Sequence, residues 1–128
     1  MSLDSAVYED GQTQHGYIAA APGLYPAVRF QYRPLLISDR RALWTEQERR
    51  GDQDTPVMEA LVKKVVSWDV KDGKGVTLNA KDPATYQRLK PKLFDRLFMI
   101  VLGNQASDPD PQAPDEPKKF DEAGTAKN

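Results

Sequence analysis

The chain has 128 residues, a formal net charge of −1 and no cysteine, so it supports one small domain and excludes thiol catalysis and cysteine-ligated metal centres. Residues 28–103 hold 15 basic and 10 acidic side chains, while both ends are acidic, and this small basic excess does not favour nucleic-acid binding. The longest apolar run, residues 97–102, is far shorter than the roughly 20 residues that a membrane-spanning helix needs.

Residues 1–15 are polar and show no hydrophobic periodicity, which predicts a flexible lead. They lack the basic stretch and apolar run of a secretory signal, so we expect the protein to stay in the cytoplasm of the cell that makes it. His15 is the single histidine of the chain, and one histidine without cysteine supplies too few ligands for a metal site or a nucleophilic triad. We therefore predict no catalytic, cofactor-binding or metal-binding residue here or elsewhere.

Two extended segments, residues 17–21 and 27–33, are predicted on either side of a turn at Pro22-Gly23. In the second segment apolar and polar side chains alternate, which is typical of a strand with one buried face. The apolar positions of that face are Val28, Phe30 and Tyr32.

Four helices are predicted, at residues 38–50, 55–64, 82–89 and 91–102. Gly51 and Gly103 are the expected stops of the first and the last, and the Asp82-Pro83 pair is the expected start of the third. Ser38 is the expected N-cap of the first helix, which is polar apart from a few anchoring side chains such as Leu43 and Trp44. The second helix carries an apolar stripe at helical spacing and gives way to a strand near residues 64–67.

A β-hairpin is predicted at residues 65–78, where a β-branched run meets an Asp-Gly turn signal. Its two strands bury a common face only if the loop has an odd number of residues, because a slip of one residue inverts every side chain. A three-residue loop with Gly73 left-handed pairs Trp68 with Val76, and a five-residue loop pairs Val70 with Val76. The expected buried face consists of Trp68, Val70, Val76 and Leu78.

These elements predict a small α+β domain at residues 16–103, with the hairpin, an N-terminal strand pair and three to four short helices. Residues 104–128 are acidic, rich in proline and nearly free of large apolar side chains. Such a composition buries too little apolar area to offset chain entropy, so a disordered tail is expected.

The final helix has apolar side chains on all sides near its end, which indicates either core or a partner surface. We predict a partner-binding surface there and at one position of the first helix. Its residues are Trp44, Phe94, Phe98, Met99, Ile100 and Leu102. Replacing Phe98 or Ile100 by aspartate is expected to abolish partner binding and to leave the domain folded.

Three sequence features together carry a family resemblance: Phe30-Gln31-Tyr32-Arg33-Pro34, Val66-Ser67-Trp68-Asp69-Val70 followed by Asp72-Gly73, and the helical ending at residues 89–103. In these features the chain resembles the small tail assembly chaperones of tailed bacteriophages. The resemblance implies a non-enzymatic protein of the host cytoplasm that binds the tape measure protein, helps recruit tail tube protein and needs no cofactor. Homo-oligomers are compatible with this role, whereas nucleic-acid or membrane partners are not expected.

Two other functions are also compatible with the sequence. The first is a structural virion component, such as a small connector or tail subunit, that forms a closed ring. The second is a nucleic-acid-binding module, which would require salt-sensitive binding of DNA or RNA.

Overall fold

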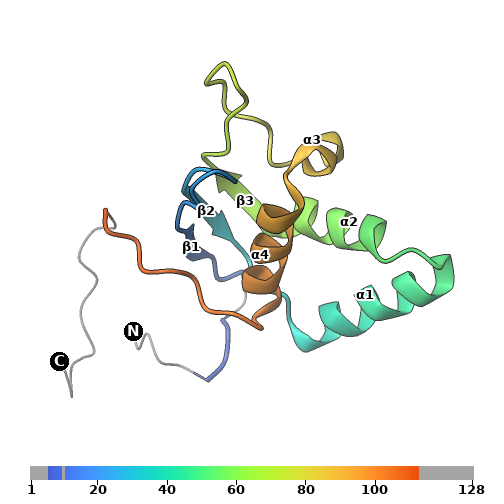
Figure 1. The fold of residues 1–128 in the computed structure, drawn as a ribbon. Helices are drawn as coiled ribbons and strands as arrows, with labels where there is room; N and C mark the ends of the chain where they lie inside the picture. Colours follow the sequence, from blue (N-terminus) through green and yellow to red (C-terminus); the bar gives the residue numbers. More distant parts are fainter. Residues whose placement is uncertain (1–5, 10, 113–128) are drawn as a thin grey trace.

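A three-stranded antiparallel sheet lies at the centre of the computed structural model, which describes residues 6–9 and 11–112 (Figure 1). The strand order is β1 (Gln14–Ile18), β2 (Val28–Tyr32) and β3 (Val65–Trp68). Four helices accompany the sheet within the described residues. They are α1 (Ile37–Arg50), α2 (Asp54–Lys64), α3 (Pro83–Arg88) and α4 (Pro91–Leu102). The predicted α+β class is therefore confirmed.

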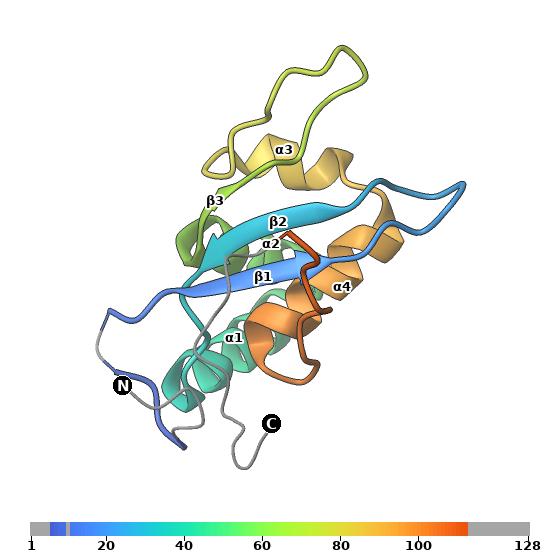
Figure 2. The ribbon, with the colours of Figure 1, turned by 90° about the vertical axis from the view of Figure 1, so that its left-hand side faces the viewer.

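The helices lie on one side of the sheet, as the two views at right angles show (Figures 1 and 2). Residues 104–112, which we call the covering segment, cross the opposite side. Helix α4 packs near both β1 and α2, while α1 extends away from the sheet and has α2 as its main neighbour. The sheet is thus covered by helices on one face and crossed by the covering segment over part of the other (Figure 2). Among the four described helices, α1 lies farthest from the sheet.

The core-facing side of β2 follows the predicted alternation, since Val28, Phe30 and Tyr32 are all buried. Phe30 is paired with Gly16 of β1 in the antiparallel register, and its ring lies over that glycine. On the other neighbour of β2, Phe30 is paired with Trp68 of β3. These cross-strand neighbours form a continuous apolar layer on the core-facing side of the sheet.

Helix α1 begins one residue earlier than predicted, and its first turn is held by a different side chain. The Asp39 carboxylate accepts a hydrogen bond from the backbone N–H of Leu36 at 2.8 Å. Ser38 lies inside the helix and is not its N-cap. At the other end Gly51 adopts a left-handed conformation with φ of 63° and closes the helix as expected.

Helix α2 passes into strand β3 without an intervening residue, because Lys64 ends the helix and Val65 begins the strand. The register between β2 and β3 shifts next to this junction, between Gln31 and Tyr32. Such a shift bends a strand and re-aims its side chains. Val65 is consequently buried, and Val66, which regular strand alternation would place on the same face as Trp68, is exposed.

The predicted hairpin is present but irregular, because only its first strand joins the sheet. We call the part that leaves the sheet and returns, residues 69–78, the excursion. Lys71 pairs with Thr77, and the N–H of Leu78 donates to the carbonyl of Val70 at 2.8 Å. The odd loop length is confirmed, but neither expected pairing occurs, since Leu78 and not Val76 faces Val70. The left-handed glycine is Gly75.

Burial in the excursion follows this register. Trp68 and Val70 are buried and Leu78 is half-buried, as the predicted face requires. Val76 is exposed, contrary to the prediction, because it directly follows Gly75 in a loop that projects away from the sheet and the helices (Figure 1). The indole N–H of Trp68 donates to the carbonyl of Leu78 at 2.8 Å and ties the returning strand to the core.

Candidate partner-binding surface

Helix α1 presents the most exposed large apolar side chains that any described helix carries. Leu43 is its single buried residue. Ile37 is 71% exposed and Trp44 is 57% exposed, and their spacing of seven residues places them on the same face of the helix. The Arg40 guanidinium lies 6.0 Å from the centre of the Trp44 ring, where a cation–π contact is favourable. We call Ile37 and Trp44 the α1 apolar face.

Two ion pairs join α1 to α2, one near each end of α1. Arg50 pairs with Glu59 at 3.0 Å, and Lys64 pairs with Asp39 at 3.0 Å. Within α1, Glu46 accepts hydrogen bonds from Arg49 and Arg50. The hydrogen bond from Arg49 is the main cause that lowers the Glu46 pKa to about 2. These polar contacts position the helix while leaving its apolar face uncovered.

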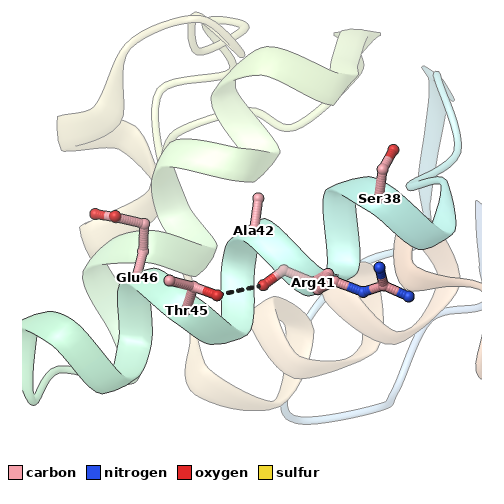
Figure 3. Close-up of a pocket in the computed structure, with 5 residues that line it drawn as sticks. All are labelled: Ser38, Arg41, Ala42, Thr45 and Glu46. Carbon is pink, nitrogen blue, oxygen red and sulfur yellow. Dashed lines mark hydrogen bonds between the residues drawn. The ribbon is translucent and has the colours of Figure 1, made fainter.

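A shallow hollow of about 370 Å³ runs along another side of α1 (Figure 3). It is lined by Ser38, Arg41, Ala42, Thr45 and Glu46. The Thr45 hydroxyl donates to the carbonyl of Arg41 at 3.0 Å. The Glu46 carboxylate forms ion pairs with Arg49 and Arg50. All five residues belong to one helix, so the hollow has no opposing wall that would orient a substrate.

The predicted surface residues of α4 are only partly accessible. Ile100 is 2% exposed and Leu102 is 8% exposed, so both belong to the core and are removed from the candidate surface. Because Ile100 is buried, Ile100→Asp would place a carboxylate in the core, and this burial disfavours the expectation that the variant leaves the domain folded. The half-buried residues are Phe94, Phe98 and Met99. They pack against the core, and a binding role for their accessible parts stays a prediction.

The covering segment is held to the outer edge of β1 by polar side chains. The Ser107 hydroxyl accepts from the N–H of Tyr17 at 2.6 Å, and the N–H of Asp108 donates to the Tyr17 carbonyl at 2.9 Å. The Asp108 carboxylate accepts from the N–H of Ala19 at 2.8 Å and pairs with Arg96 at 2.8 Å. The tail predicted from residue 104 therefore differs from the structure over residues 104–112. The rest of that predicted tail lies outside the described residues.

Asp110 completes the attachment at the centre of the sheet's outer face. Its carboxylate pairs with Arg29 at 2.9 Å and with His15 at 2.8 Å, and the hydrogen bond from Arg29 is the main reason why the Asp110 pKa falls to about 2. The other ring nitrogen of His15 lies 3.0 Å from the Gln31 side-chain nitrogen. With both nitrogens engaged, His15 has no free nitrogen for proton transfer in this arrangement.

Sequence reasoning missed the covering segment because its residues are those of an ordinary solvated loop. The available signal was the alternation of aspartate and proline at residues 108–111, which favours a fixed extended path. Nothing local to that segment indicates that its acceptors face the N–H groups of β1. Within the described residues, no group of three or more His, Asp or Glu side chains is placed to hold a metal ion.

No helix between residues 6 and 112, residue 10 excepted, is long and apolar enough to cross a bilayer. Comparisons with protein-family models, with curated proteins and with solved structures found no match to this chain.

Proposed function

We propose that this protein is a non-enzymatic tail assembly chaperone of a tailed bacteriophage. It binds the tape measure protein in the host cytoplasm and helps to recruit tail tube subunits. The observation that carries the proposal is the α1 apolar face, with Ile37 and Trp44 exposed on a helix that buries one side chain. The sequence resemblance at residues 30–34, 66–73 and 89–103 supplies the identity of the client.

The chemistry of the α1 apolar face suits an amphipathic helical client. Tryptophan is enriched among the residues that dominate binding energy at protein interfaces. Ile37 and Trp44 lie two turns apart, which matches the spacing of apolar positions along a client helix packed at a shallow angle. Covering them would keep apolar surface of both proteins from water.

Binding of the tape measure protein by purified variants tests this assignment. Trp44→Ala and Ile37→Asp each change a side chain that is mostly exposed, so both variants should keep the fold. Removing a central aromatic anchor costs about 2 kcal/mol or more, which weakens binding roughly 30-fold. Calorimetric titration of a helical tape measure fragment measures this change.

Val76→Asp is the matched control, because it places a charge at an exposed apolar side chain on the excursion tip, far along the chain from α1. It should bind the fragment as the wild type does. Unchanged affinity for both α1 variants would remove α1 from the client surface. A fixed closed oligomer across a wide concentration range, without the client, would favour the ring-forming virion component instead.

A further inference from the structure

A cavity of about 330 Å³ lies where three loop regions meet, away from the α1 apolar face. Its lining comes from the β1–β2 turn, from residues 69–78 of the excursion and from the junction between α3 and α4. Figure 2 shows these segments around one end of β2. A volume of this size is at the lower end of the range for specific binding pockets and accommodates one or two large side chains.

Each of the three segments contributes apolar surface to the cavity. Leu24 comes from the turn, Val70 from the excursion and Leu89 from the helix junction. Val70 is buried, Leu89 is half-buried and Leu24 is 44% exposed, so the apolar lining runs from the core to solvent. Such a gradient fits an apolar group that enters from outside and packs on the core.

Hydrogen bonds between the segments give the cavity a defined shape. The Lys90 ammonium donates to the carbonyl of Leu24 at 2.5 Å and joins the helix junction to the β1–β2 turn. The Leu78 N–H donates to the Val70 carbonyl, and the Leu78 carbonyl accepts from the Trp68 indole. Because these bonds already join the three segments, binding there carries a smaller ordering cost.

The charged side chains at the cavity divide into two groups. The Asp69 carboxylate accepts from the backbone N–H of Arg29, and the Asp72 carboxylate accepts from the N–H groups of Lys74 and Val76. Lys71 and Arg88 are exposed, and neither side chain forms a hydrogen bond or ion pair with any residue that the structure describes. The pKa of Asp72 is lowered mainly by its hydrogen bond from the Val76 N–H and in smaller part by the nearby charge of Arg88. The lining holds three cations, Lys71, Arg88 and Lys90, and two carboxylates, so its net charge is positive and favours an anionic partner.

We propose that this cavity binds an acidic peptide segment of a partner protein. One apolar side chain of the segment fills the space between Leu24, Val70 and Leu89, and neighbouring carboxylates pair with Lys71 and Arg88. The apolar contact provides most of the affinity, whereas the two cations select acidic over basic sequences and accelerate association. The site is separate from the α1 apolar face and does not depend on the client assigned to that face.

Fluorescence anisotropy with three labelled hexapeptides tests the proposal on the full chain. The probe is Asp-Glu-Phe-Leu-Glu-Asp, and the two comparison peptides are Asp-Glu-Ala-Ala-Glu-Asp and Lys-Lys-Phe-Leu-Lys-Lys. We expect saturable binding of the probe and at least tenfold weaker binding of each comparison peptide. Binding of the probe should also weaken as salt rises from 50 to 300 mM, since exposed charges are screened.

Charge-reversal variants locate the binding. The double variant Lys71→Glu/Arg88→Glu should weaken probe binding about tenfold or more, because it replaces attraction by repulsion at two sites. Lys92→Glu makes the same kind of change at an exposed position of α4 that does not line the cavity, and it should leave binding unchanged. Amide NMR shifts on titration should centre on Leu24, Val70 and Leu89.

Absence of probe binding, equal binding of the three peptides, or equal effects of the cavity and control variants would each overturn the proposal. Shifts centred on Trp44 would likewise place the peptide on α1 and remove it from the cavity. Loss of tape measure binding in the Trp44→Ala variant with normal probe binding would separate the two surfaces. The two proposals can thus fail independently.

Discussion

Gly16→Ala is the most direct test of how closely the sheet packs at its centre. Gly16 pairs with Phe30 across β1 and β2, and the aromatic ring occupies the space where a side chain at residue 16 would begin. A Cβ atom built on Gly16 would lie 2.3 Å from Cζ of Phe30 and 2.5 and 2.7 Å from two other ring atoms. Ordinary carbon–carbon contacts are about 3.5–4.0 Å, so the ring or the strand has to shift.

The cost follows from the burial of both partners. Phe30 is among the least exposed residues of the core, and overpacking a buried site costs about 1–3 kcal/mol. For a domain of this size each kcal/mol lowers Tm by roughly 4–8 °C, so a cost of about 1–3 kcal/mol corresponds to a drop of about 4–24 °C. Urea unfolding followed by circular dichroism gives the free energy of unfolding, and calorimetry gives Tm.

Two further variants separate the clash from a general effect of alanine. Gly73→Ala introduces a Cβ that meets nothing within 4 Å, so its free energy of unfolding should stay within about 0.5 kcal/mol of the wild type. In a Phe30→Leu background the distal ring atoms are gone, and Gly16→Ala should cost less than about 0.5 kcal/mol. A cost below that value in the wild-type background, or an equal cost in both backgrounds, would refute the close packing of Gly16 and Phe30.

Three other predictions follow from the described contacts. Ile100→Ala should lower the free energy of unfolding by about 2–5 kcal/mol, because it removes a core side chain, and a loss below 1 kcal/mol in urea unfolding would contradict its burial. Trp68→Phe should cost about 1–3 kcal/mol, since the Leu78 carbonyl loses its indole donor; a circular dichroism melt indistinguishable from wild type would argue against that bond. The Asp110 pKa lies at about 2, below its usual value of 3.8, so its stabilising contribution is complete above about pH 4 and is lost as pH falls towards 2. Asp110→Asn should therefore increase hydrogen exchange at the Tyr17 amide near neutral pH and have a much smaller effect near pH 2, where about half of the Asp110 carboxylate is protonated; equal effects at both pH values would show that the carboxylate charge is not responsible.

The parts of the fold that could be predicted are those whose signals are local. Alternation along β2 placed its buried face correctly, and the Asp82-Pro83 pair marked the start of α3, where the Asp82 carboxylate accepts from the Ala84 N–H at 3.0 Å. The helical stop at Gly103 was also visible, because φ there is 92° and favours glycine. In each case the determining contact lies within a few residues in sequence.

The errors arise where distant segments decide the outcome. The end of α4 is apolar on several sides because it packs against α2 and close to β1, and this enclosure buries Ile100 and Leu102. A single helical pattern cannot distinguish such enclosure from an exposed partner surface. Trp44 is the opposite case, since the sequence placed it among anchoring side chains and the structure leaves it mostly exposed, as the partner-surface prediction required.

The direct passage from Lys64 of α2 to Val65 of β3 constrains how the length of this chain can vary. One added residue at that junction would turn the preceding helix by about 100° or exchange the two faces of the following strand. In contrast, the α1–α2 turn at residues 51–53 and the excursion tip at residues 73–75 are largely exposed and should accept insertions, tags or fused domains. Homologues should accordingly differ in length at those two turns and keep the helix–strand junction free of gaps.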